Sequence, residues 1–454
     1  MPGGGTPVSG TPDGTTFLAG KPPPGQTYDG SASRAQISGD GLWVVYHHGS
    51  ENLVVTNKPP AGCPKPPGPQ TQIYRTNLVT GATELVSRAP NGCYANGESS
   101  FPDISADGRF VVFTSQGTNL VTDGNGPQQD IFLKDMSTGV TSIVSVSTSG
   151  AAGVGGWSSR PDISEDGNTI AYSSDATNLV PGDGNGQQDC FVTSRSNVRN
   201  VRLSSVGNAG QALNGLSYRC QLSANGSMMV FSSFAGNATA TALSQGQRIY
   251  LRNLQANTTT LVSRRPNGTP ALASRPDISG NGACVTYQSQ DAGIVIGDPD
   301  TTDDVFLFTI ASGNTAMMSL DSSGNHVTAA SNRIVVNGNC TRVGFVSSSN
   351  RLVPGDRNST RDTFMRDLTT GTIFLLSVNS AEQPARPCQP KPTPTTTTTT
   401  LPGTHDPTGA EDISTRPSLS DDGRVVAFIS DTCGLVPEEP QMAGEAGVIV
   451  RWMR

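Results

Sequence analysis

The chain has 454 residues, 15% of them charged, with a net charge of −7 and an isoelectric point near 5.2. This acidic balance argues against a nucleic-acid partner, because binding to a phosphate backbone needs concentrated Lys and Arg. No run approaches 18 apolar residues, so we expect no membrane-spanning helix. Glycine and proline together supply 84 residues (52 and 32), which suits a protein built from many turns.

A short pattern recurs seven times and predicts the fold. The clearest copy, from Ser100 to Gly108, reads Ser-Phe-Pro-Asp-Ile-Ser-Ala-Asp-Gly and precedes a β-branched and aromatic run. The glycine of each copy supplies the positive φ of a tight hairpin. These glycines are Gly41, Gly108, Gly167, Gly226, Gly282, Gly338 and Gly423. The steps between them, 67, 59, 59, 56, 56 and 85 residues, are typical of β-propeller blades.

Each repeat divides into four expected strands. In the second repeat they cover about 100–105, 109–115, 130–135 and 141–146. The sequence therefore predicts an all-β, seven-bladed propeller of four-stranded antiparallel blades, forming one domain over 1–454. The expected blades are 33–87, 100–146, 159–205, 217–263, 274–320, 331–377 and 414–454.

The seventh repeat lacks a fourth strand, and the other end of the chain supplies a candidate. Residues 13–20 align with the fourth strand of the first repeat, 80–87. We expect this N-terminal strand to complete the last blade, which leaves no open seam in the ring. Two segments fall outside the repeat: a Pro-rich insertion at 58–70 and a Pro/Thr-rich insertion at 383–408.

The eight cysteines contain no Cys-Xaa-Xaa-Cys pair. Cys63 and Cys93 flank the first blade, and Cys388 and Cys433 occupy the matching segments around the seventh. This recurrence indicates two disulfides and an oxidising, extracellular or periplasmic location; the alternative is buried free thiols. Residues 1–5 lack a signal-peptide pattern, so we expect either a cytoplasmic protein or an exported chain that begins after processing. The remaining cysteines are expected in the core: Cys190, Cys220, Cys284 and Cys340.

Loops between the second and third strands of four blades carry oxygen side chains at similar spacing. They are Asp123, Asn125 and Asp130; Asp183, Asn185 and Asp189; Asp298, Asp300 and Asp304; and Asp356, Asn358 and Asp362. Ca²⁺ takes six to eight oxygen ligands, so each loop is a candidate calcium site. The alternative is that Asp, Asn and Gly serve the turns themselves.

First strands of propeller blades line the central channel, which makes their polar residues candidates for ligand binding. Arg160, Arg275 and Arg416 are predicted to lie there, together with the Asp of the Pro-Asp pairs. Such a lining could bind an anionic ligand or a peptide. We favour a structural role over ligand binding, because the same residues recur in every blade with a clear repeat. In this role each Asp accepts hydrogen bonds from donors near its own hairpin.

No motif for a catalytic nucleophile or a phosphate loop occurs in the sequence. The four histidines, His47, His48, His326 and His405, have no motif around them and are expected to be inert. A hydrolase that uses a pair of carboxylates is an alternative that the sequence does not exclude, because the sequence alone does not place such a pair.

The copies of Pro102-Asp103-Ile104-Ser105-Xaa-Asp107-Gly108-Arg109 resemble the WD-like repeat of TolB-type β-propellers. The run 129–135 and the turn at 369–371 are similar to the same family, and the resemblance covers almost the full chain. The usual Ser-Pro-Asp-Gly turn is replaced here by Ser-Ala-Asp-Gly and related forms. The resemblance implies the propeller fold. It implies little about function, because such propellers serve as periplasmic assembly partners, extracellular modules and regulatory domains of peptidases.

These observations favour a non-catalytic, extracellular or envelope-associated propeller that acts as a scaffold for a protein partner or a ligand. One alternative is an extracellular polysaccharide hydrolase or lyase with carboxylates in the central channel. Carboxylates converging there from positions that differ between blades would favour the enzyme. Another alternative is a structural subunit of a surface layer or filament.

Overall fold

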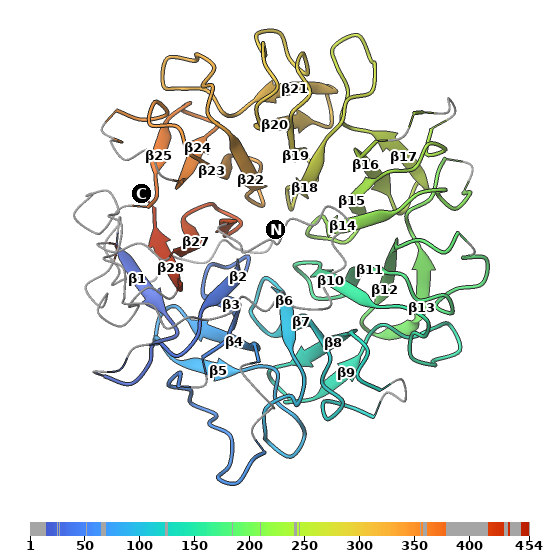
Figure 1. Cartoon of the computed structure of the whole chain (residues 1–454), viewed down its shortest axis with the longest axis vertical. Helices are drawn as coiled ribbons and strands as arrows, with labels where there is room; N and C mark the ends of the chain where they lie inside the picture. Colours follow the sequence, from blue (N-terminus) through green and yellow to red (C-terminus); the bar gives the residue numbers. More distant parts are fainter. Residues whose placement is uncertain are drawn as a thin grey trace, which may run out of the picture.

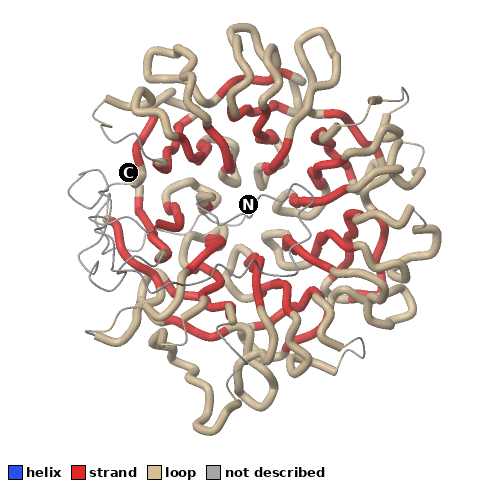
Figure 2. The backbone as a smooth tube through the Cα atoms, viewed as in Figure 1, coloured by secondary structure: helices blue, strands red, loops and turns tan. Residues whose placement is uncertain are grey.

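The computed structural model describes residues 15–453 apart from 25, 27, 51, 65–69, 123–125, 184, 209, 240–242, 245, 355, 357–360, 378–415, 431–434 and 436–445. Within this part of the chain the secondary structure consists of strands and no helices (Figures 1 and 2). Seven four-stranded sheets radiate from a central axis, which confirms the predicted seven-bladed propeller (Figure 1).

Strands run outward from the axis in chain order within blades 1 to 6. Blades 1 to 3 contain β2 Ala32–Ile37, β3 Trp43–His48, β4 Gln72–Asn77, β5 Thr83–Leu85; β6 Ser99–Ile104, β7 Phe110–Ser115, β8 Asp130–Asp135, β9 Thr141–Ile143; and β10 Ser158–Ile163, β11 Thr169–Ser174, β12 Asp189–Ser194, β13 Asn197–Leu203. Blades 4 to 6 contain β14 Ser217–Leu222, β15 Met228–Ser233, β16 Arg248–Asn253, β17 Thr258–Leu261; β18 Ser274–Ile278, β19 Cys284–Ser289, β20 Asp304–Thr309, β21 Asn314–Met317; and β22 Ser331–Val336, β23 Arg342–Ser347, β24 Asp362–Asp367, β25 Ile373–Leu375.

Blade 7 is assembled from both ends of the chain. Its sheet has the order β1-β28-β27-β26, with β26 at Ser418–Leu419, β27 at Val425–Ser430 and β28 at Gly447–Trp452. The outer strand, β1 at Thr16–Ala19, pairs antiparallel with β28. Leu18 of β1 is only 2% exposed and belongs to the core shared by blades 7 and 1. The predicted closure by the N-terminal strand is confirmed.

Hydrogen bonds within the Ser-Xaa-Asp-Gly hairpin explain why these residue types recur in the repeat. In blade 2 the Ser105 hydroxyl donates to Asp107 Oδ1 at 2.6 Å and accepts the Phe110 N–H at 3.0 Å. Gly108 has φ 72°, and a Cβ on it would lie 2.2 Å from Trp43 Cδ1 in blade 1. The glycine is therefore needed for the turn and for close packing against the preceding blade.

Blade 6 departs from this pattern. The prediction that Gly338 is its turn glycine is wrong, because the left-handed residue there is Cys340, with φ 56°. Gly338 lies two residues earlier, at the position of Ala106 in blade 2. A disulfide ties Cys340 to Cys284 of blade 5, so the seam is covalent where other seams have glycine contacts.

Three disulfides form among the described residues. Cys63–Cys93 joins the insertion of blade 1 to the segment after β5, as predicted. The expectation that the other four described cysteines are free core residues is wrong. They form the pairs Cys190–Cys220, between blades 3 and 4, and Cys284–Cys340, between blades 5 and 6. Cys388 and Cys433 lie outside the described residues.

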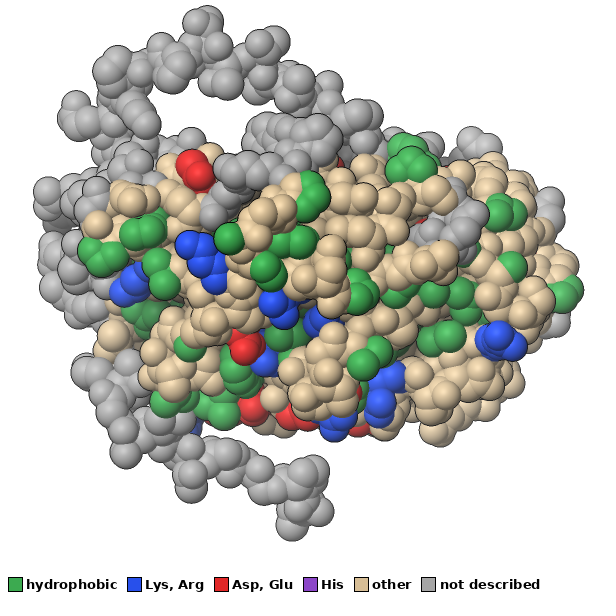
Figure 3. Space-filling model, turned by 90° about the horizontal axis from the view of Figure 1, so that it is seen from below, with side chains coloured by type: hydrophobic (Ala, Val, Ile, Leu, Met, Phe, Trp, Pro, Cys, Tyr) green, Lys and Arg blue, Asp and Glu red, His purple; other side chains and the backbone are tan. Residues whose placement is uncertain are grey.

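The core lies between the faces of neighbouring blades, and each cluster draws on adjacent sheets. Aromatic residues of the second and third strands stack in register, as Phe113 and Phe132 do at 5.9 Å between ring centroids. In the face shown in Figure 3, exposed apolar side chains are scattered among polar ones. No helix in the described part of the chain is long and apolar enough to cross a membrane.

Candidate functional site

The axial channel is lined by the first strand of each blade (Figure 1). Equivalent residues at three positions form three layers around it. The arginine layer is Arg34, Phe101, Arg160, Arg219, Arg275, Arg333 and Arg416. Two residues on, the aspartate layer is Gln36, Asp103, Asp162, Gln221, Asp277, Val335 and Ser418. The turn layer is Gly39, Ala106, Glu165, Ala224, Gly280, Gly338 and Asp421.

The arginine layer has an unusual backbone. In blades 1 to 6 its residue has φ between 50° and 57°, a left-handed conformation that side chains other than glycine rarely adopt. The register with the second strand shifts at the same place, for example between Ser159 and Asp162. This is a β-bulge, a feature that re-aims a side chain, and it recurs in each of the six blades.

Phe101 replaces arginine in blade 2 and separates two guanidinium groups. Arg34 Cζ lies 3.7 Å from the centre of the Phe101 ring, and Arg160 Cζ lies 4.6 Å from it. The ring itself is 7% exposed. Cation–π attraction to this ring holds Arg34 and Arg160 at the channel although their charges repel.

The aspartate layer joins neighbouring blades. Asp103 Oδ2 accepts the Ile163 N–H at 2.8 Å, Asp162 Oδ2 accepts the Leu222 N–H at 2.7 Å, and Asp277 Oδ2 accepts the Val336 N–H at 2.9 Å. Asp103 and Asp277 also accept the expected local hydrogen bonds, from the N–H groups of Ile104 and Ile278, so the bonds to the next blade add to the local ones. A contact that repeats around the ring accounts for the recurrence of these residues in the sequence.

Arg416 is the positive charge that these buried carboxylates share. Its Nη2 lies 3.4 Å from Asp277 Oδ1, although the two residues belong to blades 7 and 5. Burial raises the pKa of Asp103 to about 6 and raises that of Asp162, and the charge of Arg416 opposes both rises.

Two cavities occupy the channel. The arginine cavity, about 620 Å³ including space open to solvent, is lined by Arg34, Phe101, Arg160, Arg219 and Arg416 among others. The acidic cavity, about 730 Å³ on the same measure, is lined by Asp103, Asp162, Glu165, Asp277 and Asp421 among others. They share Gln36, Gln221 and Arg416. Of the predicted channel arginines, Arg160 and Arg416 line a cavity and Arg275 lines neither; its charge opposes the rise in the pKa of Asp303 that burial causes.

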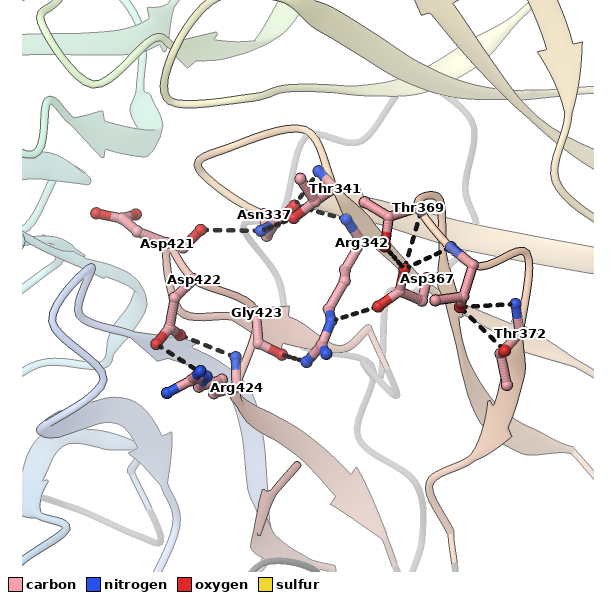
Figure 4. Close-up of polar contacts among 11 residues, drawn as sticks. Asn337, Thr341, Arg342, Asp367, Thr369, Thr372, Asp421, Asp422, Gly423 and Arg424 are labelled. Carbon is pink, nitrogen blue, oxygen red and sulfur yellow. Dashed lines mark hydrogen bonds and ion pairs between the residues drawn. The ribbon is translucent and has the colours of Figure 1, made fainter. Parts of the chain in front are cut away.

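The turn layer narrows the channel at the end that contains the acidic cavity. The Ala106 N–H donates to Glu165 O at 2.9 Å, and the Asp421 N–H donates to Gly39 O at 3.0 Å. Blade 6 holds the turn of blade 7 through Asn337, whose Nδ2 donates to Asp421 O at 2.9 Å (Figure 4). Arg342 donates to Gly423 O at 3.0 Å and to Asp367 Oδ2 at 3.1 Å.

Glu165 and Asp421 break the symmetry of the turn layer, where the other five blades have glycine or alanine. Their carboxyl groups lie close enough for each to shift the pKa of the other. Burial, and then the negative charge of Asp421, raise the pKa of Glu165 to about 8; burial also raises the pKa of Asp421. The sequence shows these two acids, but only the ring brings them together.

The predicted calcium loops share one structural contact. The first residue of the third strand accepts a serine hydroxyl from beyond the fourth: Ser145 to Asp130 at 2.7 Å, Ser205 to Asp189 at 2.6 Å, Ser319 to Asp304 at 2.5 Å, and Ser377 to Asp362 at 2.5 Å. In blade 3, the Asn185 amide donates to Asp189 Oδ2 at 2.7 Å, and burial raises the pKa of Asp183. Asp356 is 8% exposed; Asp123, Asn125 and Asn358 lie outside the described residues.

In blade 5 the loop forms a cluster with a histidine. One possible ligand atom from each of Asp298, Asp300, Asp304 and His326 lies within 4.8 Å of the others, a group that could hold a metal ion. His326 Nε2 lies 3.1 Å from Asp304 Oδ2, and Nδ1 lies 3.8 Å from Asp300 Oδ2. Burial raises the pKa values of Asp298 and Asp304.

His326 was missed by sequence reasoning, although a signal exists. It pairs with Leu320 in an isolated bridge that recurs after the fourth strand of blades 1 to 5. The equivalent residues are Tyr94, Ala152, Ala212 and Pro270. A comparison of the repeats at this position marks His326 as the exception. His47 and His48, by contrast, are buried within β3, and burial lowers the pKa of each to about 3.

Comparison with known proteins supports the fold. No family model matches the chain, and no curated protein matches it. An oligogalacturonate lyase from Vibrio parahaemolyticus is 9% identical, with a TM-score of 0.55 and coverage of 96% of both chains. An oligogalacturonate lyase in complex with manganese is 10% identical, with a TM-score of 0.53 and coverage of 97% of both chains.

The chain has the seven-bladed β-propeller fold. TolB from Acinetobacter baumannii is 12% identical, with a TM-score of 0.40; the match covers 76% of this chain and 63% of that chain. The chain thus spans less than two thirds of the TolB length. At these identities, the likeness concerns the fold alone.

Proposed function

We propose that this propeller binds an anionic ligand, an oligosaccharide that bears carboxylates, at the arginine-lined end of its channel. The arginine layer is the observation that carries the proposal. It places Arg34, Arg160, Arg219 and Arg416 around one cavity of about 620 Å³. Guanidinium groups bind carboxylates through paired hydrogen bonds.

The backbone supports the same proposal. A left-handed residue other than glycine is strained, and strain of this kind is found at functional sites. Here it recurs at the arginine layer of six blades. The amide groups of Gln36 and Gln221, which line the same cavity, are suited to hydroxyl groups of a sugar. The oligogalacturonate lyases of similar fold make an oligogalacturonate the first ligand to test.

Binding is tested by titration calorimetry with trigalacturonate and with neutral galactotriose. We expect the wild-type chain to bind only the acidic sugar. Arg34→Gln combined with Arg160→Gln should weaken binding at least about tenfold, because each lost charged contact is worth about 1.5–3 kcal/mol. Arg109→Gln is the matched control, since Arg109 is an exposed arginine paired with Asp135 outside the two channel cavities. Equal binding of both sugars, or equal affinity of all variants, refutes the proposal.

The competing function is a lyase acting on the same ligand, favoured by the two lyases of similar fold. Among the described residues that line the two cavities there is no histidine. The aspartate layer is engaged in contacts between blades, which favours binding without catalysis. Incubation with oligogalacturonate separates the two functions: a lyase produces an unsaturated sugar with a new ultraviolet absorption, whereas a binding protein leaves the ligand intact.

We further infer that the blade 5 cluster binds a divalent cation. Calcium is the ion predicted for the four loops, and it prefers oxygen ligands. The imidazole of His326 instead suits a transition metal, and the three carboxylates beside it make Mn²⁺ the first such metal to test. Melting temperatures measured with Ca²⁺ and with Mn²⁺ distinguish the two ions. A manganese-dependent rise that His326→Ala abolishes supports the transition metal; a calcium-dependent rise that Asp183→Ala with Asp189→Ala abolishes supports calcium in blade 3.

An extracellular or envelope location is part of the proposal. Disulfides persist in oxidising compartments, and three form here. A protein partner would contact the loops that project from the ring, which is the role proposed for the insertion at 58–70. Affinity capture from the native cell envelope, with a chain lacking 58–64 as control, tests that role.

A further inference from the structure

The interaction between the carboxyl groups of Glu165 and Asp421, which line the same cavity, crosses the channel. Glu165 belongs to blade 3 and Asp421 to blade 7, which are not neighbours. The backbone hydrogen bonds between turns of the described residues instead join adjacent blades, as when the Asp40 N–H donates to Ala106 O at 3.0 Å. A contact across the axis joins blades 3 and 7 directly, whereas the neighbouring contacts link them only through blades 1 and 2.

The other turns leave space that the two carboxyl groups fill. A Cβ added to Gly280 would lie 2.3 Å from Glu165 Oε1. Added Cβ atoms on Gly39 and Gly338 would lie 2.5 Å from Asp421 Oδ2 and 2.7 Å from Asp421 Oδ1. In Figure 4 the Asp421 carboxylate points away from the blade 6 residues that hold its backbone. The pair therefore occupies the narrow end of the acidic cavity.

Charged groups around the pair are mostly acidic. The acidic groups on the turns are Asp166 beside Glu165, Asp422 and Asp40 beside Asp421, and Asp107 near Asp40. The basic groups at the same turns are Arg195, whose charge lowers the pKa of Asp166, Arg342, which donates to Gly423 O, and Arg424 beside Asp422. The turns of blades 4 to 6 carry neutral Asn225, Asn281 and Asn339. Deeper in the cavity lie Asp103, Asp162, Asp277 and the single cation Arg416. Two carboxyl groups that interact this strongly cannot both ionise without repulsion, so a shared proton is needed to keep them together.

We propose that Glu165 and Asp421 form a proton-dependent latch that closes the narrow end of the channel and opens when the shared proton is lost. The latch lies at the end opposite to the arginine cavity and does not rest on anion binding. The pKa of Glu165, which burial and the Asp421 charge raise to about 8, keeps the latch closed at neutral pH and below. It opens as the pH rises above that value.

Hydrogen exchange of the full chain tests the latch. The readouts are the backbone N–H groups of Ala106 and Asp421, which donate to the neighbouring turns. After correction for the intrinsic pH dependence of exchange, we expect both to exchange about tenfold faster above pH 9 than at pH 7. Glu165→Gln keeps a donor to Asp421 and cannot ionise, so its exchange should stay at the pH 7 level. The Gly226 N–H, bonded within its own turn, is the internal control.

Infrared spectroscopy supplies a second readout. The wild-type chain should show a protonated carboxyl at pH 7 that disappears near pH 8 and is missing in Glu165→Gln. Asp421→Asn is the alternative variant if Glu165→Gln does not fold. A pH-independent exchange rate in the wild type, the same pH response in the variant, or the absence of that carboxyl signal would overturn the latch.

Discussion

The carboxylate of Asp162, in blade 3, accepts a 2.7 Å hydrogen bond from the Leu222 N–H and a 2.8 Å bond from the Gln221 side chain, both in blade 4. Asp162→Ala leaves these donors without their acceptor at a buried seam. We expect the free energy of unfolding to fall by about 1–3 kcal/mol, measured by urea denaturation. Asp162→Asn keeps an acceptor for Leu222 and should lose less. Equal losses would show that the seam contact is unimportant.

The strand β1 closes the ring, so its removal should affect all blades. Deleting residues 1–20 exposes the edge of β28 and removes Leu18 from the core of blades 7 and 1. We expect a lower melting temperature and a greater tendency to aggregate. Leu18→Asp tests the same closure without shortening the chain, because it places a charge in that core. A truncated chain with the melting temperature of the wild type would contradict the closure.

The left-handed backbone of Arg160, with φ 52°, predicts an unusual ranking of substitutions. Arg160→Ala and Arg160→Gly both remove the guanidinium group, but only glycine adopts this conformation without strain. The glycine variant should be more stable than the alanine variant by about 1 kcal/mol, as thermal unfolding would show. A more stable alanine variant would mean that the bulge relaxes.

Cys340 combines a strained turn with a disulfide to Cys284. Cys340→Ser keeps the strain and loses the covalent seam, so we expect a loss of about 2–4 kcal/mol. Cys340→Gly loses the same bond but removes the strain, and should be about 1 kcal/mol more stable than the serine variant. Chemical denaturation of both variants under oxidising conditions checks the difference. Identical stabilities would exclude strain at this turn.

Local chemistry explains how much of the fold the sequence reveals. The Ser105 and Asp107 hydrogen bonds lie within one hairpin, so the repeat could be recognised and the blades counted. The contacts at the seams between blades are harder to predict from the sequence, because they join residues a full blade apart. The repeat predicts Gly338 as the turn glycine of blade 6, because no local rule indicates that Cys340 replaces it.

The candidate sites follow the same division. The recurrence of Arg160, Arg275 and Arg416 indicated the arginine layer from the sequence alone. The contacts of Glu165 with Asp421 and of His326 with Asp304 depend on the closed ring and on loop geometry. Both sites show in the sequence only as exceptions to the repeat, which makes departures from symmetry the signal to examine.

A structure determined with bound trigalacturonate tests the central claim most directly. Our account predicts the sugar in the arginine cavity, with its carboxylates on the guanidinium groups of Arg34, Arg160 or Arg219. A ligand bound only at the loops outside the channel, or an arginine cavity that stays free of sugar at saturating concentration, would contradict it.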